Sequence, residues 1–335
     1  MYRKERLADM LDRARQIDAV EGLDRLQRNG GFLPVGYVPA ESTIPSRVVW
    51  VDLADSRLDR PFFLGELLAE HRGPREWFVA PATSLRHGLL DGLFKRPIAG
   101  LVFHVARCGS TLARRMLGAV PGRVIFSEPG VLNAMLLSDE RVPLDQLLSC
   151  LELAAARRKG RAVVKCTSWN LFHADRLLPA SGSPPAIFIH RDPGEVLASL
   201  HGLDWNERLP EAARQSGGVA DPDEGNAMHL ERLMRQGLRL AESGRVRCVA
   251  YPDLVHRLVD GDLPVFLGYE VDEATRRCML DMAGEYSKDP RRRHRPDGAA
   301  KAAIVAQVPA IRRAAERLKP LHEALLRHSG PPHDR

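Results

Sequence analysis

After residue 97 the chain alternates short apolar runs with amphipathic segments. The apolar runs have the length and continuous hydrophobicity of buried strands. They occupy residues 98–105, 123–126, 162–166, 186–190 and 246–251. Between them, apolar residues recur every three to four positions, which predicts helices. The helical segments are 112–117, 130–137, 144–158 and 194–203. Strands that alternate with helices form βαβ units, so the sequence predicts an α/β fold whose parallel sheet has helices on both faces.

The first 97 residues lack this alternation. Apolar positions three to four residues apart predict an amphipathic helix over 3–28. Beyond it, prolines and glycines break the pattern, apart from a strand-like run at 47–51 and a helical segment at 63–71. We therefore expect a mainly helical or irregular N-terminal region, residues 1–97, followed by one α/β domain, residues 98–335.

The charge and composition of the chain limit the kinds of partner that it is expected to bind. The chain of 335 residues has 49 Lys+Arg against 43 Asp+Glu, which gives a net charge of +6. Most of the basic residues are arginines, and only 6% of all residues are aromatic. No basic stripe with interleaved aromatics is present, which favours a small polyanion over nucleic acid. No apolar run reaches the roughly 18–20 residues of a membrane helix, and the charged N-terminus is unlike a signal peptide, so we expect a cytoplasmic protein. The five scattered cysteines predict reduced thiols and no metal site.

A candidate anion-binding loop follows the first apolar run of the α/β domain. It reads Arg107-Cys108-Gly109-Ser110-Thr111 and opens a helix. Small residues let backbone N–H groups approach an anion, the helix N-terminus adds positive potential, and Ser110 and Thr111 supply hydroxyl donors. The loop is not a Walker A motif, which disfavours a nucleoside-triphosphate hydrolase. The alternative is an ordinary helix cap.

A second candidate motif follows the run at 186–190. Arg191 closes that strand, and Ser199 lies about two helical turns further on, on nearly the same helix face. An arginine and a hydroxyl placed in this way suit a second phosphate group. The alternative is that Asp192 and Pro193 only start the helix, as a cap and a first-turn proline.

Taken together, the two motifs resemble those of the sulfotransferases that use 3′-phosphoadenosine 5′-phosphosulfate (PAPS). In that family the loop binds the 5′-phosphosulfate, which the resemblance assigns to residues 107–111, with Cys108 in the place of the usual first Ser. The family binds the 3′-phosphate through an Arg followed by a downstream Ser, the places that Arg191 and Ser199 occupy. The resemblance covers roughly residues 98–301 and is closest to bacterial members.

The resemblance also implies further nucleotide contacts. The strand that ends in Tyr251-Pro252-Asp253-Leu254 is similar to a family strand, and it implies that Tyr251 lies beside the adenine nucleotide. The basic run 288–295, with Lys288 and Arg292, stands where these enzymes place a late loop that closes over the 3′-phosphate. The family fold is of the P-loop NTPase-like type, a three-layer parallel α/β sheet.

The catalytic groups follow from the same resemblance. Lys165 matches a family lysine at the end of the third strand, and together with Arg107 it implies positive charge at the transferred sulfuryl group. Cytosolic members have a His shortly after that lysine, but Thr167 stands there in this chain. Some members use a Glu after the second strand, and Glu128 fits that place as the general base if burial raises its pKa. The alternatives are that His173 is the base, or that Glu128 only caps a helix.

The sequence thus predicts a sulfotransferase that moves a sulfuryl group from PAPS to a hydroxyl or amine of a small-molecule acceptor, releases 3′-phosphoadenosine 5′-phosphate (PAP) and needs no metal. A small-molecule or nucleotide kinase and a catalytically lapsed nucleotide-binding module are the alternatives. A polar segment at 204–223 predicts a long loop or lid. Residues 1–97 either complete an acceptor pocket or form a homodimer surface.

Overall fold

The computed structural model divides the chain into two compact units. The first comprises residues 1–100, 121–165 and 173–184, and the second comprises 101–120, 166–172 and 185–335. The structure describes residues 15–16, 21, 24–26, 31–54, 58, 76–87, 97–138, 142–205, 209, 221–285 and 298–330. The predicted helix at 63–71, most of the predicted loop at 204–223, and the basic run with Lys288 and Arg292 lie outside the described residues.

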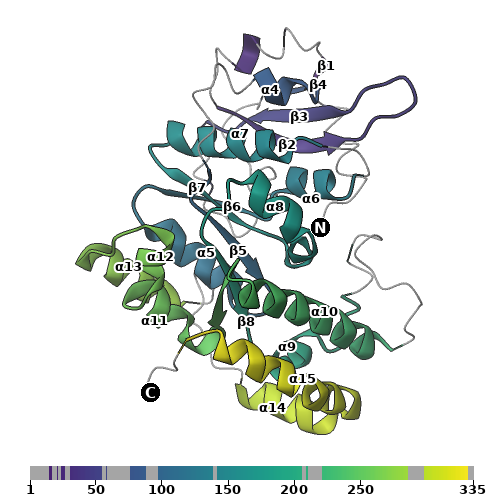
Figure 1. The fold of residues 1–335 in the computed structure, drawn as a ribbon, viewed down its shortest axis with the longest axis vertical. Coiled ribbons are helices and arrows are strands. Elements are labelled where there is room, and N and C mark those ends of the chain that lie inside the picture. The colour runs from purple at the N-terminus through teal and green to yellow at the C-terminus, as the bar shows by residue number, and fades with distance from the viewer. Residues whose placement is uncertain are drawn as a thin grey trace. The chain divides into compact units, whose positions relative to one another are not determined.

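The first unit contains a four-stranded sheet and a parallel strand pair (Figure 1). The sheet has the order β1-β4-β3-β2, with β1 parallel to β4 and the other pairs antiparallel. Its elements are β1 (Arg15–Gln16), β2 (Phe32–Val38), β3 (Arg47–Asp52), β4 (Trp77–Pro81) and α4 (Ser84–His87). The remaining elements are β6 (Arg123–Ser127), α6 (Gly130–Leu136), α7 (Leu144–Arg157), β7 (Arg161–Lys165) and α8 (Ala174–Ala180). Helices α6 and α7 both contact β2, so the sheet is packed against the helices of the same unit.

The expectation of a mainly helical N-terminal region is wrong for the described residues. The strand β1 lies within the predicted helix 3–28, and β2 and β4 were not predicted. β2 escaped the pattern because Pro34 and Gly36 interrupt it, and the register shifts between these two residues. All seven residues of β2 are nevertheless buried, so the strand is held by burial and by pairing to β3.

The second unit contains three parallel strands in the order β5-β8-β9. Its elements up to β9 are β5 (Gly100–His104), α5 (Ser110–Ala119), η2 (Ser168–His173), β8 (Ala186–His190), α9 (Pro193–Leu200), α10 (Pro222–Glu242) and β9 (Arg247–Ala250). After β9 follow η4 (Tyr251–Asp253), α11 (Leu254–Val259), α12 (Leu263–Leu267), α13 (Glu273–Ala283), α14 (Gly298–Gln307) and α15 (Pro309–Arg327). Every residue of β5 and of β8 is buried, as a strand covered on both faces requires.

Five strands of the described residues therefore run parallel, two in the first unit and three in the second, and helices separate them along the chain. This confirms the predicted α/β class and the predicted parallel strands. Each of these strands begins and ends within two residues of its predicted limits. Continuous apolar runs made them predictable, because a strand buried on both faces has no polar alternation.

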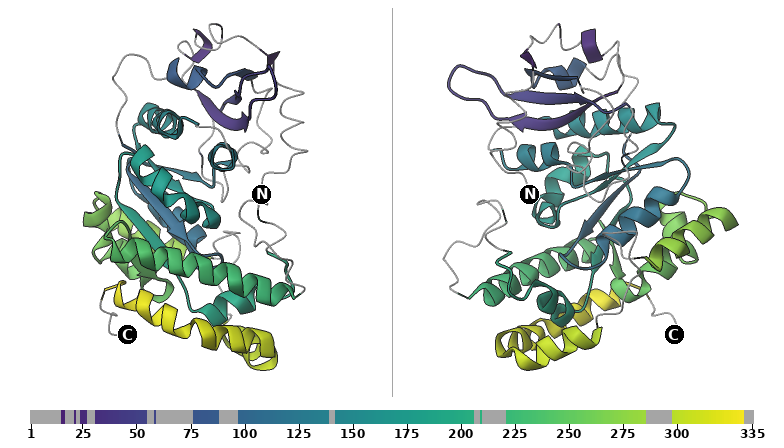
Figure 2. Two further views of the ribbon diagram at one scale, coloured as in Figure 1. Left: turned by 45° about the vertical axis from the view of Figure 1, so that its right-hand side comes forward. Right: turned by 180° about the vertical axis from the view of Figure 1, so that it is seen from behind.

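Two long helices of the second unit run side by side. Helix α15 contacts α10, α9 and β9, and the views in Figure 2 keep it alongside α10. The side chains of Ile311, Ala314, Leu318 and Leu325 form its buried stripe. None of the helices in the described ranges combines the length and the apolar character that a bilayer crossing requires.

Candidate functional site

The loop that joins β5 to α5 has the backbone of an anion-binding turn. Gly109 is the N-cap of α5 in the left-handed conformation, with φ 84°, and Arg107 is also left-handed, with φ 60°. A non-glycine residue with positive φ is unusual, and such residues concentrate at functional sites. Because Gly109 has no side chain, no side-chain oxygen caps the helix. Ser110 and Thr111 are therefore the first two residues of α5 and not its cap, which removes the ordinary-cap alternative.

Tyr251, the first residue after β9, lies directly against this loop. A Cβ built on Gly109 would lie 2.5 Å from a ring carbon of Tyr251, closer than real Cβ atoms approach. Glycine is thus required at this position twice, by its positive φ and by the ring that fills the space of a side chain. The residue that the resemblance assigned to the adenine nucleotide therefore touches the loop assigned to the phosphosulfate.

Arg191 joins the same group of residues from the end of β8. Its guanidinium carbon lies 4.1 Å from the centre of the Tyr251 ring, a cation–π contact. Its Nη1 donates a long hydrogen bond of 3.5 Å to the carbonyl oxygen of Arg107. The structure thus brings together residues from the three nucleotide motifs of the sequence. With these contacts, the side chain of Arg191 is only 13% exposed.

Glu195 is a member of this group that the sequence analysis missed. Its carboxylate accepts a hydrogen bond of 2.6 Å from Nε of Arg191 and also contacts Nη2. Its backbone carbonyl accepts a hydrogen bond of 2.9 Å from the hydroxyl of Ser199. Arg191 and Ser199 therefore both contact Glu195, on the helix that carries Ser199. The spacing of four residues between Arg191 and Glu195 was the available signal, but such pairs are common on helix surfaces.

The helix start at Asp192 is confirmed. The Asp192 side chain caps α9 by accepting a hydrogen bond from the Glu195 N–H at 3.0 Å, and Pro193 is in the first turn. This capping does not compete with a role of Arg191 in binding, since the guanidinium makes none of these bonds. The helix-start interpretation is therefore confirmed for Asp192 and Pro193, and phosphate binding by Arg191 and Ser199 stays a prediction.

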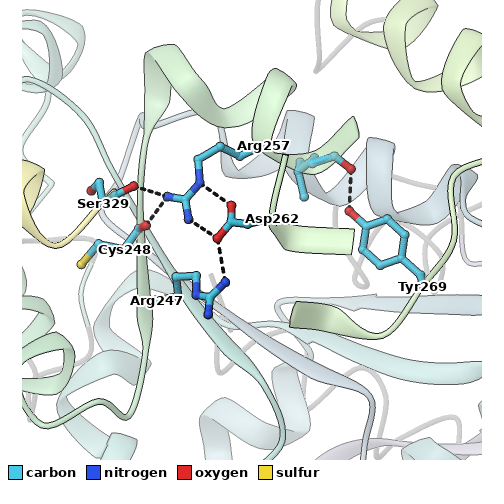
Figure 3. A network of polar contacts seen from close by, with 7 residues as sticks. Arg247, Cys248, Arg257, Asp262, Tyr269 and Ser329 are labelled. Atoms are coloured by element: carbon cyan, nitrogen blue, oxygen red, sulfur yellow. Dashed lines mark hydrogen bonds and ion pairs between the residues drawn. The ribbon is translucent and has the colours of Figure 1, made fainter. Parts of the chain in front are cut away.

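A polar network around Arg257 joins Cys248 of β9, Asp262 and Ser329 (Figure 3). Arg257 donates from Nη1 to the carbonyl oxygens of Cys248 and Ser329, each at 2.6 Å, and from Nε and Nη2 to Asp262. The hydroxyl of Ser329 donates to the Leu325 carbonyl, so its oxygen accepts from Nε2 of His190 at 2.8 Å. The network joins the residue before Arg191, the strand before Tyr251 and the end of the last helix. His190 is fully buried, and burial lowers its pKa to about 3.

The candidate catalytic pair lies in the first unit. Lys165 ends β7 and its ammonium pairs with the carboxylate of Glu128, the residue after β6. The Glu128 N–H also donates to the Lys165 carbonyl at 2.7 Å, which ties the ends of the two strands. Glu128 has φ 54°, the left-handed conformation again. The N-cap of α6 is Pro129 and no side chain caps that helix, so the capping alternative for Glu128 is wrong.

The second candidate base, His173, ends the short 3₁₀ helix η2 and precedes α8. It is half-buried, and burial, with a smaller contribution from Arg176, lowers its pKa, which favours the neutral imidazole. Thr167, which stands where cytosolic sulfotransferases have a histidine, donates its backbone N–H to Asn170 at 2.8 Å. The structure keeps both Glu128 and His173 as candidates, and Glu128 contacts Lys165.

The structure says less about the remaining predicted contact residues. Cys108 is fully buried, so its thiol is not exposed to a ligand. Ser110 and Thr111 are largely buried at the helix start. Lys288 and Arg292 lie outside the described residues. Within the described ranges no group of three or more His, Cys, Asp or Glu side chains is arranged to hold a metal ion.

Comparison with known proteins gives neighbours among solved structures alone. No protein-family model matches the chain, and no curated protein matches its sequence. The chain is similar to the sulfotransferase domain from the curacin biosynthetic pathway, with a TM-score of 0.45 and 15% identity over 67% of this chain and 98% of that one. A sulfotransferase from Mycobacterium avium gives a TM-score of 0.42 and 16% identity over 69% of this chain and 78% of that one. The sulfotransferase domain from the olefin synthase of Synechococcus PCC 7002 gives 0.40 and 19% over 67% and 94%. At these values, functional conclusions for this chain rest on its own residues.

Proposed function

We propose that this protein is a sulfotransferase that moves a sulfuryl group from PAPS to a hydroxyl or amine of a small-molecule acceptor. One observation carries the proposal. The anion-binding loop, Arg191 and Tyr251 come from three separate sequence motifs, yet Tyr251 contacts both Gly109 and Arg191, and Arg191 reaches the Arg107 carbonyl. A nucleotide with an aromatic base and anionic groups at two positions of its ribose suits such an arrangement.

The residues of the second unit would bind the donor. The N–H groups at the start of α5 and the hydroxyls of Ser110 and Thr111 suit the 5′-phosphosulfate, and Arg107, which is exposed, adds a cation. The planar guanidinium of Arg191 suits the 3′-phosphate, since it donates parallel hydrogen bonds to two oxygens. The late basic residues Lys288 and Arg292 are proposed as further contacts from the sequence alone. The Tyr251 ring would stack with the nucleotide or orient Arg191 toward it.

The chemistry that follows is an in-line displacement at sulfur. The acceptor oxygen or nitrogen forms a bond to sulfur, the bond from sulfur to the bridging phosphate oxygen breaks, and PAP leaves with that electron pair. The acceptor's proton passes to a base, for which Glu128 is the first candidate and His173 the second. Lys165 and Arg107 would stabilise the negative charge that grows on the bridging and sulfuryl oxygens, as cations do in phosphoryl transfer.

The proposal is tested by titration calorimetry of the full chain with PAP, AMP and ATP. We expect PAP to bind at least about tenfold more tightly than AMP, because only PAP offers a 3′-phosphate to Arg191. PAP without a preference over AMP would contradict the donor assignment. ATP bound more tightly than PAP, and dependent on Mg²⁺, would favour the kinase alternative. Conversion of PAPS to PAP in the presence of a panel of acceptors then separates an active enzyme from a lapsed binding module.

A further inference from the structure

Glu195 contacts both residues that the sequence motif assigns to the 3′-phosphate. Its carboxylate binds Nε and Nη2 of Arg191, and its carbonyl accepts from the Ser199 hydroxyl. Among the described residues, no hydrogen bond joins Arg191 directly to Ser199. Glu195 is therefore the group through which Arg191 and Ser199 are held on one side of α9.

The helix start would have offered Glu195 a different partner. Asp192 at the N-cap and Glu195 three residues later have the spacing of a capping box, in which the Glu side chain turns back to the N-cap N–H. The Asp192 half of that motif is formed, with its side chain on the Glu195 N–H at 3.0 Å. The Glu195 carboxylate instead binds Arg191. The Glu195 side chain therefore pairs with the Arg191 guanidinium in place of the second hydrogen bond of the capping box.

The contacts around Arg191 leave one edge of its guanidinium for a ligand. An arginine side chain has five N–H donors. Glu195 takes the side formed by Nε and Nη2, the Tyr251 ring covers a face, and the Arg107 carbonyl takes a donor of Nη1. The described residues supply no partner for the other donors of Nη1 and Nη2. These are the donors that bind two phosphate oxygens side by side.

On these grounds, and resting on the proposed function, we infer that Glu195 is a positioning residue of the nucleotide site, one that fixes Arg191 so that its terminal N–H groups face the 3′-phosphate. The carboxylate also balances the charge of Arg191, so that recognition depends on directed donors more than on an unpaired cation. Glu195 would act through Arg191 and would not touch the nucleotide. Removal of Glu195 should therefore weaken only ligands that carry a 3′-phosphate.

The test compares three variants by calorimetry with PAP and AMP. Glu195→Ala should weaken PAP binding by roughly 10- to 100-fold, the value of one hydrogen bond to a charged group, and leave AMP binding unchanged. Glu195→Gln keeps an acceptor oxygen for Nε and should lose less. Glu231→Ala is the matched control, because it removes another Glu–Arg pair four residues apart, on α10, and it should change neither ligand.

The outcomes separate this inference from the proposed function. If Glu195→Ala binds PAP as tightly as the unaltered protein or more tightly, Glu195 is a bystander or a competitor of the phosphate and the inference is wrong. Equal losses for PAP and AMP indicate general damage to the site and also overturn it, and thermal unfolding of each variant identifies such damage. An unaltered protein that does not prefer PAP over AMP overturns the proposed function and, with it, this inference.

Discussion

Lys165 and Glu128 are paired through both their side chains and their backbones. The buried ammonium of Lys165, only 1% exposed, contacts the carboxylate of Glu128, which is 21% exposed, and the Glu128 N–H donates to the Lys165 carbonyl. The glutamate is thus the more exposed member of the pair. This difference in exposure supports Glu128 as a proton acceptor with Lys165 as its fixed partner.

Glu128→Gln should remove the base and retain donor binding. The amide still fits the space and still offers an oxygen to Lys165, but it cannot take up a proton, so turnover should fall by roughly 10²–10⁴-fold. PAP affinity, measured by calorimetry, should remain unchanged, since the predicted nucleotide contacts are made by other residues. Turnover is measured as PAP released from PAPS with an acceptor from the panel.

A second ion pair with one partner on β7, that of Glu152 with Arg161, provides the control for that experiment. Glu152 is buried and binds the side chain of Arg161 and the Ala162 N–H at the beginning of β7, whereas Glu128 and Lys165 lie at its end. Glu152→Gln should affect stability and spare turnover. Near-normal turnover in Glu128→Gln would exclude Glu128 and direct attention to His173.

Gly109→Ala should weaken nucleotide binding more than its loss of stability alone explains. The new methyl group is strained by the φ of 84° and would meet the Tyr251 ring at 2.5 Å, so the ring has to move, and Arg191 stacks on that ring. We expect a loss of about 1–2 kcal/mol of stability from the backbone and a further loss from the clash. Calorimetry should show weaker PAP binding.

Gly244→Ala isolates the backbone contribution. Gly244 is also left-handed, with φ 69°, but a Cβ there meets no atom within 4 Å. This variant should lose about 1–2 kcal/mol of unfolding free energy and bind PAP normally. If Gly109→Ala binds PAP as well as Gly244→Ala does, the contact between Gly109 and Tyr251 has no part in the site.

The sequence predicted those parts of the fold whose signal is local. The strand at 186–190 was predicted with its observed limits, because every residue of β8 is buried and the apolar run is unbroken. In the N-terminal region, β2 was hidden because a proline and a glycine stand inside a strand whose burial comes from distant parts of the chain. Periodicity cannot show such a strand, since the packing that selects it is not local.

The candidate site likewise has residues that the sequence predicts and a residue that it does not. Residues 107–111 and Arg191 were found from motifs at a strand end and a helix start, and Tyr251 was found from the resemblance to a family strand. Glu195 was missed because the sequence allows two partners for its carboxylate, the Asp192 N–H of a capping box or the Arg191 guanidinium. The choice between them depends on where Tyr251 and the Arg107 carbonyl hold that guanidinium, which only the folded chain shows.

His229→Leu should stabilise the protein. His229 lies on α10 at 3% exposure, against the Phe172 ring, and neither of its ring nitrogens has a hydrogen-bond partner among the described residues. An unsatisfied buried polar group costs about 1–3 kcal/mol, so an apolar side chain of similar size should raise the unfolding free energy by up to that amount. Urea unfolding at pH 7 measures the change.

His104→Leu is the matched control for a satisfied histidine. His104 is also buried, but its ring nitrogens lie 2.8 Å from the carbonyl oxygens of Val105 and Cys166. Its replacement removes hydrogen-bond donation from the imidazole to these buried carbonyls and should lower stability by about 1–3 kcal/mol. If both substitutions destabilise the chain to the same extent, the nitrogens of His229 are satisfied in solution by a group that the structure does not contain.

Two buried histidines, His190 and His229, should make the protein less stable in acid. Burial lowers the pKa of His190 to about 3, with smaller contributions from His322 and Arg257, and burial with Arg232 lowers that of His229 to about 4. In the unfolded chain each imidazole has its ordinary value of 6.5, so below that pH the unfolded state binds protons that the folded state does not. Stability should thus be complete above pH 6.5 and should fall as the pH decreases toward 4.

The slope of that loss tests the prediction quantitatively. Each histidine should contribute about 1.4 kcal/mol per pH unit between its two pKa values, so His190 and His229 together should give at least about twice that slope at pH 4.5–6. Burial also lowers the pKa values of His173 and His322, which add to the slope. His229→Leu should remove one histidine's share, because one group fewer takes up a proton on unfolding. Asp260 and Asp262 take up protons mainly below this range, because their ordinary pKa is 3.8 and arginine neighbours lower the pKa further in the folded state. Urea unfolding at several pH values gives the slope directly, and a slope in His229→Leu equal to that of the unaltered protein would show that His229 takes up its proton in the folded state.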